Sequence, residues 1–154
     1  MSILRLTHIG ICVADMERSL RFYRDLLGFN YLSRLDVEGE PSNTLLELPD
    51  VKLRAEYLER DGTRIELLHY ASPGTQGDGS PSPMNRLGLT HLSLRVENLE
   101  QLLKQLAGAG VRVLESTNVY NPHFQAGAVF ITDPDGTRIE LVAAPGDPTR
   151  PPGG

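Results

Sequence analysis

The chain has very little cysteine, since Cys12 is the only one in its 154 residues. A single thiol excludes an intramolecular disulfide framework and a zinc site built on paired cysteines, and it suits a reducing compartment. The sequence also lacks an apolar run long enough to span a membrane, and its N-terminus lacks the pattern of a signal peptide. We therefore expect a cytoplasmic protein with no membrane partner.

Basic residues are also in short supply. Lys and Arg together number 15 against 20 Asp and Glu, which gives a net charge of −5 and a pI of about 5.3. No basic cluster is present to neutralise phosphates, so nucleic acid is not an expected partner. The apolar fraction of 40% and the charged fraction of 23% are typical of a globular protein, and the length allows one compact domain with a full core.

What the chain does contain is an internal repeat. The octapeptide DGTRIELL at 61–68 returns as DGTRIELV at 135–142, and the segment LTHIGICVADMERSL from Leu6 is matched by LTHLSLRVENLEQLL from Leu89. A repeat of this length, about 80 residues, is too long for a solenoid and indicates two copies of a small module.

Both copies predict the same order of elements. The first begins with a strand at 7–13 and a helix from the N-cap Asp15 to Gly28, and the second with a strand at 91–96 and a helix that follows the N-cap Asn98. Asp-Gly pairs precede the last strand of each copy and predict tight turns. The remaining predicted strands are 29–35, 44–48, 51–59 and 63–70 in the first copy, and 111–115, 127–132 and 137–143 in the second.

We therefore predict an α+β fold of two tandem β-α-β-β-β modules, at residues 1–70 and 86–144, within one compact domain. The Gly-, Pro- and Ser-rich residues 71–85 are typical of a linker. Residues 145–154, with the sequence PGDPTRPPGG, are expected to be a disordered tail.

Alternation along the strands separates an apolar face, expected beneath the helix, from a face that carries one histidine and one glutamate. These residues are His8 and Glu66 in the first copy, and His91 and Glu140 in the second. Taken singly, each histidine is more often a satisfied or half-exposed residue and each glutamate a solvated one, and the octapeptide could simply preserve a good hairpin. Both pairs persist while their neighbours differ, which favours a shared role.

Two imidazoles and two carboxylates suit a divalent metal ion such as nickel, zinc, cobalt, manganese or ferrous iron. A pseudo-twofold axis that relates the modules would bring the four side chains around one point. On an octahedral ion they would leave two positions for water or substrate, as Lewis-acid catalysis requires.

The segments LTHIGICVADMERSLRFYRDLLGF and DPDGTRIELV together resemble the vicinal oxygen chelate superfamily, and the resemblance covers roughly residues 4–143. That superfamily includes glyoxalase I, methylmalonyl-CoA epimerase, fosfomycin-resistance thiol transferases, extradiol dioxygenases and bleomycin-binding proteins. The resemblance implies paired modules that form a cupped, mostly antiparallel sheet around a metal site. It implies the same four ligands: His8, Glu66, His91 and Glu140.

This ligand set is most similar to that of glyoxalase I. Extradiol dioxygenases usually lack the carboxylate of the first module, bleomycin-binding members lack the ligands, and the epimerase usually has glutamine at the position of Glu66 and a further glutamate near that of Asn43. The match to glyoxalase I is incomplete. Cys12 stands where that enzyme has an arginine that binds glutathione, and STNVYNPHFQAG has no clear glutathione-binding counterpart, which counts against glutathione as cosubstrate.

The resemblance implies a metal-dependent lyase or isomerase that acts on a small oxygen-chelating substrate through an enediolate-like intermediate. Glu66 or Glu140 would be the base that carries the proton. The alternatives are a ferrous extradiol-type dioxygenase, an isomerase like methylmalonyl-CoA epimerase, and a non-enzymatic small-molecule binder. A homodimer is also expected, with the ligands drawn from one chain or from two.

Five further residues are candidates for binding the substrate. Arg64, Arg95 and Arg138 share the faces of the proposed ligands, where they could bind an anionic substrate or orient a glutamate. Tyr120 and His123 are expected in a loop before a strand, which could close over a pocket or simply be surface.

Overall fold

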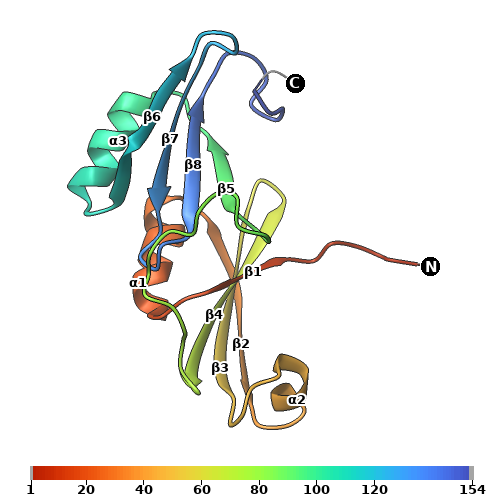
Figure 1. Cartoon of the computed structure of the whole chain (residues 1–154). Helices are drawn as coiled ribbons and strands as arrows, with labels where there is room; N and C mark the ends of the chain where they lie inside the picture. The colour runs from red at the N-terminus through yellow and green to blue at the C-terminus, as the bar shows by residue number, and fades with distance from the viewer. Residues whose placement is uncertain (1, 153–154) are drawn as a thin grey trace. The chain divides into compact units, whose positions relative to one another are not determined.

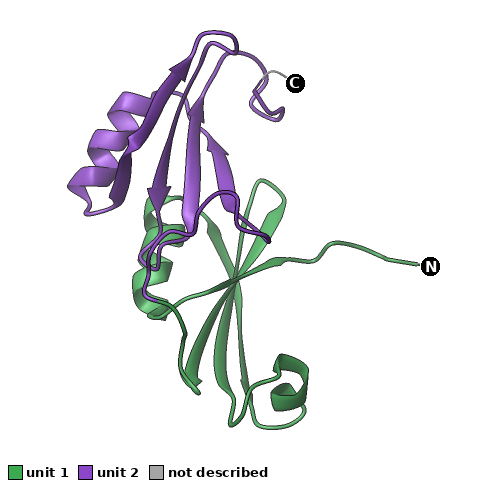
Figure 2. Ribbon diagram, viewed as in Figure 1, with its two compact units in different colours: residues 1–77 green, residues 78–154 purple. Residues whose placement is uncertain are grey.

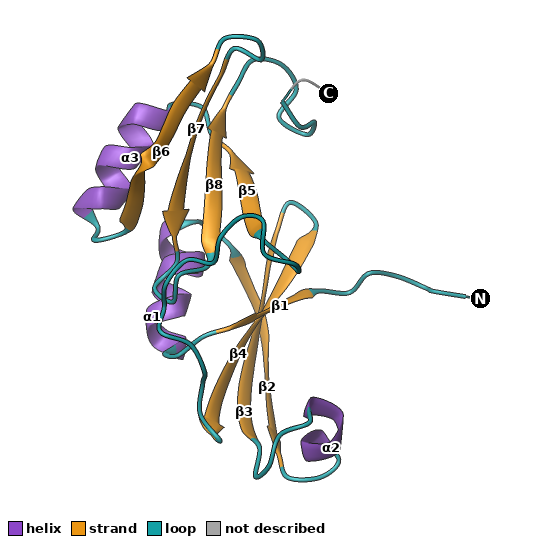
Figure 3. Cartoon of the chain, in the orientation of Figure 1, coloured by secondary structure: helices purple, strands orange, loops and turns teal. Residues whose placement is uncertain are grey.

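The structure is a computed structural model that describes residues 2–152. Two compact units divide the chain, residues 1–77 and 78–154, and each is coloured separately in Figure 2. In both units a strand and a helical segment precede three further strands of one sheet (Figures 1 and 3). The predicted α+β fold of tandem β-α-β-β-β modules is confirmed.

The sheet of the first unit has the strand order β1-β4-β3-β2. Strand β1 runs parallel to β4, and the other neighbours are antiparallel. The elements are β1 (Ile9–Cys12), α1 (Met16–Leu20), the π-helical η1 (Arg21–Leu26), β2 (Asn30–Glu38), α2 (Ser42–Leu46), β3 (Lys52–Arg60) and β4 (Thr63–Ser72).

The second unit repeats this topology with the order β5-β8-β7-β6, in which β5 runs parallel to β8. Its elements are β5 (His91–Arg95), α3 (Leu99–Gly108), β6 (Arg112–Asn121), β7 (Ala126–Thr132) and β8 (Arg138–Ala143). No helix in the described part of the chain is both long enough and apolar enough to cross a membrane.

The repeated octapeptide is a turn followed by a strand in both units. In the first unit Asp61 and Gly62 both have positive φ, as a two-residue hairpin turn requires. The side chains of Ile65, Leu67, Ile139 and Leu141 are fully buried, whereas Glu66 and Glu140 are partly exposed on the opposite face. The expected separation of an apolar and a polar face is therefore confirmed for the last strand of each module.

Side chains cap helices α1 and α3 as the sequence predicts. The Asp15 carboxylate accepts a hydrogen bond from the backbone N–H of Arg18 at 2.9 Å, and the Asn98 side chain accepts one from Gln101 at 3.0 Å. The first helix does not continue regularly to Gly28. It changes to a π-helix from Arg21 onward. At the end of this π-helix the N–H of Leu27 donates to the carbonyl of Phe22, five residues earlier.

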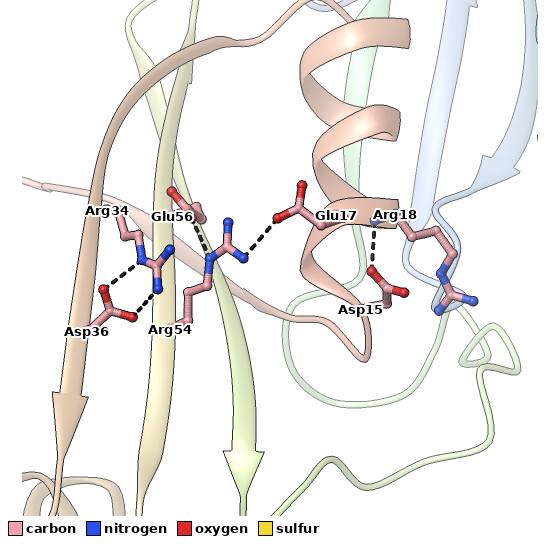
Figure 4. Close-up of polar contacts among 7 residues, drawn as sticks. All are labelled: Asp15, Glu17, Arg18, Arg34, Asp36, Arg54 and Glu56. Atoms are coloured by element: carbon pink, nitrogen blue, oxygen red, sulfur yellow. Dashed lines mark hydrogen bonds and ion pairs between the residues drawn. The ribbon is translucent and has the colours of Figure 1, made fainter.

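An ion-pair network joins α1 to the sheet of the first unit. Arg54 on β3 lies between two carboxylates, with Glu17 of α1 at 2.9 Å and Glu56 of β3 at 2.7 Å (Figure 4). Glu56 is only 1% exposed, and its second oxygen, Oε2, accepts no hydrogen bond within the described part of the chain. The network therefore places a buried carboxylate against one guanidinium.

The strand predicted at 44–48 was wrong, because this segment contains helix α2. The apolar residues there suggested a strand, but local polar contacts favour the helix. The Glu40 carboxylate accepts a hydrogen bond from the N–H of Thr44, and the side chain of Asn43 accepts one from the N–H of Val51 at 2.8 Å. Leu45 is 82% exposed, so it contributes nothing to the core.

The loop predicted before β7 was also wrong in part. Strand β6 continues past the predicted end at residue 115, so that Tyr120 lies in the strand, opposite Gly127 of β7, and His123 lies in the turn that follows. A bulge interrupts the pairing. There the hydroxyl of Thr117 donates to the carbonyl of Leu114 and accepts from the N–H of Phe130, which replaces the missing ladder contacts.

The segments predicted as linker and tail have contacts of their own. Strand β4 extends to Ser72, and the carbonyl of Ser82 accepts a hydrogen bond from Arg138. In the tail, Asp147 accepts hydrogen bonds from the backbone and side chain of Thr149. Residues 153–154 lie outside the described residues, and disorder of the tail stays a prediction.

Candidate functional site

The first unit brings His8 and Glu66 together. Nε2 of His8 lies 3.0 Å from Oε2 of Glu66, and Tyr57 of β3 donates its hydroxyl to Oε1 of the same carboxylate at 2.6 Å. The Tyr57 ring also packs edge-on against the imidazole, with ring centroids 5.4 Å apart. The hydroxyl of Thr7 lies 3.0 Å from Nδ1 of His8, which leaves Nε2 directed at the glutamate.

The second unit builds the same pair from the matching positions. Nε2 of His91 lies 3.6 Å from Oε2 of Glu140, and the hydroxyl of Thr90 lies 2.8 Å from Nδ1 of the imidazole. Phe130 packs edge-on against His91 at 5.4 Å between centroids. Phe130 pairs with Glu140 across β7 and β8 as Tyr57 pairs with Glu66 across β3 and β4.

The two carboxylates differ in the source of their hydroxyl donor. Glu140 accepts from the hydroxyl of Ser93 at 2.7 Å, while Phe130 has no hydroxyl to offer. In the first unit the residue paired with Glu66 on β1 is Gly10, which has no side chain, and the donor is Tyr57. Each glutamate therefore has one hydroxyl donor, from opposite neighbouring strands.

The contact with Glu66 affects the acidity of Tyr57. The hydrogen bond to the carboxylate, then burial and the negative charge of Glu66, raise the pKa of Tyr57 from 10.0 to about 12. A tyrosine with this pKa stays protonated at neutral pH and remains a hydrogen-bond donor.

The three arginine candidates have different surroundings. Arg95 donates to the carbonyls of Ala144 at 2.9 Å and Pro145 at 2.7 Å, so its guanidinium holds the start of the C-terminal segment. Arg138 donates to a backbone carbonyl and lies over the ring of Phe130 at 5.4 Å. Arg64 is exposed and has no ion-pair partner within residues 2–152, so it is the arginine best placed to meet an anion from solvent.

The remaining candidates lie at the surface. Tyr120 is 66% exposed on β6, and His123 packs against Phe124 in the turn after it. Cys12 is exposed at the end of β1. Neither Tyr120 nor His123 has a hydrogen bond, ion pair or ring contact with one of the His–Glu pairs in the described structure.

The donor set fits a divalent metal ion in chemistry but is incomplete within each unit. Imidazole Nε2 and carboxylate oxygen are ordinary ligands of zinc, nickel, cobalt and iron. Within residues 2–152 no group of three or more His, Cys, Asp or Glu side chains gathers in a way that could hold an ion. Each unit by itself therefore supplies a pair of potential ligands.

Tyr57 and Ser93 were not among the residues selected from the sequence. The position of Tyr57 could have been found from the turn, because a two-residue turn at Asp61–Gly62 fixes the hairpin register and places Tyr57 opposite Glu66. Ser93 shares the strand face of His91 by simple alternation, but alternation does not say which glutamate its hydroxyl reaches.

Known proteins resemble this chain over most of its length. The profile of the Glyoxalase/Bleomycin resistance protein/Dioxygenase superfamily matches residues 5–141. Uncharacterized protein YaeR of Escherichia coli is 31% identical over 134 residues, which cover 87% of this chain and 92% of that protein. A probable lactoylglutathione lyase of Synechocystis is 30% identical over 139 residues, which cover 89% of this chain and 93% of that protein.

More distant matches extend the range of chemistry and support the fold. One is a methylmalonyl-CoA epimerase of Bos taurus, which is 25% identical over 91% of this chain and 74% of that protein. Another is a catechol-2,3-dioxygenase of Bacillus subtilis, which is 27% identical over 89% of this chain and 41% of that protein. A solved structure of a glyoxalase family protein from Bacillus cereus superposes with a TM-score of 0.79 at 23% identity, covering 95% of this chain and 97% of that one.

Proposed function

The chain belongs to the glyoxalase/bleomycin resistance protein/dioxygenase superfamily, and from this premise we propose that it is a divalent-metal-dependent lyase or isomerase of the glyoxalase I type. Its proposed ligands are His8, Glu66, His91 and Glu140, and its substrate is a small molecule with two neighbouring oxygens. The observation that supports this most is the repeated His–Glu pair, which recurs in the same strand register in both units.

A bound divalent ion would polarise a carbonyl of the substrate and so acidify the adjacent C–H bond. The chain's own residues then move the proton. Glu140 is the better candidate for the base, because it is 30% exposed and its histidine contact is long, whereas Glu66 is 13% exposed and held at both oxygens. Glu66 serves chiefly as a ligand in this proposal.

The charge near the first pair suggests the character of the substrate. Arg64 precedes Glu66 by two residues on the same strand face and faces solvent without an ion-pair partner. A guanidinium there favours a substrate with a carboxylate or another anionic group. Whether the substrate is a thiol adduct is tested directly by supplying 2-oxoaldehydes with and without glutathione.

The proposal predicts proton exchange next to a carbonyl. The cobalt- or nickel-loaded protein is incubated in deuterium oxide with a panel of 2-oxoaldehydes, hydroxyketones and acyl-CoA thioesters, and NMR detects deuterium at the exchanging carbon. Glu140→Ala should abolish the exchange and keep the wild-type circular dichroism spectrum. Full activity of Glu140→Ala on a substrate that the wild type turns over would refute this mechanism.

The alternative functions give different results in the same assays. Oxygen uptake with catechols after anaerobic loading with ferrous iron would indicate a dioxygenase, and exchange confined to acyl-CoA thioesters would indicate an epimerase. Binding of a panel compound without exchange or oxygen uptake would indicate a small-molecule binder.

A further inference from the structure

We infer that Tyr57 and Ser93 are positioning residues that hold the two glutamates in different ways, so that Glu66 is fixed at both oxygens and Glu140 at only one. The inference rests on the proposed function, which makes these glutamates metal ligands. It adds two residues that act through the carboxylates and assigns a different task to each half of the repeat.

The evidence is the distribution of contacts over the carboxylate oxygens. In the first unit Oε1 of Glu66 accepts from Tyr57 at 2.6 Å, and Oε2 lies 3.0 Å from His8. In the second unit the same oxygen of Glu140, Oε2, accepts from Ser93 at 2.7 Å and lies 3.6 Å from His91. Oε1 of Glu140 accepts no hydrogen bond within the described residues.

These patterns have different consequences for a carboxylate. A group bonded at both oxygens has little freedom to rotate, and a hydroxyl on one oxygen leaves the other directed toward an ion beside the histidine. A group bonded at one oxygen can rotate about that contact and present its free oxygen to a proton. Tyr57 therefore suits a permanent ligand, and Ser93 suits a carboxylate that must move during turnover.

The repeat itself shows that an aromatic ring packs against the histidine without a hydroxyl. Phe130 lies against His91 at the same centroid distance, 5.4 Å, as Tyr57 against His8. Tyr57→Phe should therefore keep the ring contact and remove only the donor. Tyr70→Phe is a matched control, because Tyr70 lies on β4, on the same sheet face as Glu66, and its hydroxyl has no hydrogen-bond partner in the described structure.

The hydroxyl donor to Glu66 can also be moved from β3, where Tyr57 lies, to β1. Gly10 pairs with Glu66 as Ser93 pairs with Glu140, so Gly10→Ser places a hydroxyl at the equivalent position. A Cβ at Gly10 would lie 3.2 Å from Cδ1 of Leu68, the end of a flexible side chain that can shift slightly.

The experiment is a calorimetric titration of the metal-free full chain with cobalt(II), together with the visible absorption spectrum of the cobalt complex. Tyr57→Phe should weaken cobalt binding by about 10- to 100-fold and change the spectrum, as loss of an orienting contact does. Tyr70→Phe should bind like the wild type, and Tyr57→Phe with Gly10→Ser should regain most of the lost affinity. Ser93→Ala should bind about 10-fold more weakly, and Ser93→Thr, which keeps the hydroxyl, should not.

The results separate this inference from the proposed function. A wild-type chain that binds no cobalt overturns both. A wild type that binds cobalt overturns the inference alone in any of three cases: Tyr57→Phe binds as tightly as Tyr70→Phe, the transplanted serine restores nothing, or Ser93→Thr is as weak as Ser93→Ala.

Discussion

Replacing Arg54 by leucine should destabilise the first unit by far more than an exposed ion pair contributes. The substitution leaves Glu56 only 1% exposed with no cation beside it. Removing one partner of a buried ion pair costs about 3–5 kcal/mol, and because Arg54 is 26% exposed we expect a value near the lower end, about 3 kcal/mol. Burial lowers the pKa of Arg54, but the hydrogen bonds that its guanidinium donates to Glu56 and Glu17 more than compensate, and the pKa is raised.

Two matched variants separate the buried contact from the exposed one. Glu17→Gln removes the negative charge of the outer carboxylate, which is 63% exposed, and should cost less than about 1 kcal/mol. Arg54→Leu with Glu56→Leu replaces the buried pair by apolar side chains and should recover most of the stability, to within about 1 kcal/mol of the wild type.

The assay is urea unfolding followed by circular dichroism, with amide hydrogen exchange of β3 to assign the loss to the first unit. The cost of Glu17→Gln should shrink at high salt and that of Arg54→Leu should not, because salt screens the exposed pair more strongly. If Arg54→Leu were as mild as Glu17→Gln, or if the double variant were as unstable as Arg54→Leu, the buried pair would not have the role described.

Three further outcomes follow from individual contacts. In the metal-free folded chain the tyrosinate absorbance should rise in a last step near pH 12, and Tyr57→Phe should remove this step; a last step near pH 10 would contradict the expectation. Because the pKa of Tyr57 is raised in the folded chain, the contribution of its hydrogen bond to stability is complete below the unfolded value of 10.0 and disappears as the pH passes about 12. Arg95→Ala should increase amide exchange and proteolysis in residues 145–150, whereas unchanged protection would show that the guanidinium does not hold this segment. Asn43→Ala should cost about 1–2 kcal/mol in urea unfolding by leaving the N–H of Val51 without its acceptor, and no change in stability would contradict this.

The repeat explains why so much of the fold could be predicted. The repeated sequence DGTRIEL and the alternating strands in both halves placed His8 with Glu66 and His91 with Glu140 on shared faces, and the structure brings the members of each pair within 3.0 and 3.6 Å. Strand alternation depends only on local geometry, so it is visible in the sequence.

Features that depend on contacts between distant side chains were missed. Residues 44–48 were predicted as a strand because three of these five residues are leucine. The segment instead contains part of helix α2, next to which the Asn43 side chain accepts a hydrogen bond from the backbone N–H of Val51, eight residues later. Strand β6 was predicted to end at residue 115 because the residues that follow are polar. In the structure they form a β-bulge, in which the Thr117 hydroxyl makes the hydrogen bonds to Leu114 and Phe130, and the strand continues beyond it. The direction of the guanidinium of Arg95, toward the C-terminal segment, also depends on where residues 144–150 fold.

The central claim is that the repeated His–Glu pairs are metal ligands, and the four histidines of the chain allow it to be tested directly. The measurement is the cobalt(II) affinity of four single alanine variants, compared with the wild type. His8→Ala and His91→Ala should each lose more than about 100-fold in affinity, while His69→Ala, at a histidine 3.3 Å from the carbonyl of Val13, and His123→Ala, in the β6–β7 turn, should bind like the wild type. Equal affinity in all four variants, or no cobalt binding by the wild type, would contradict the claim.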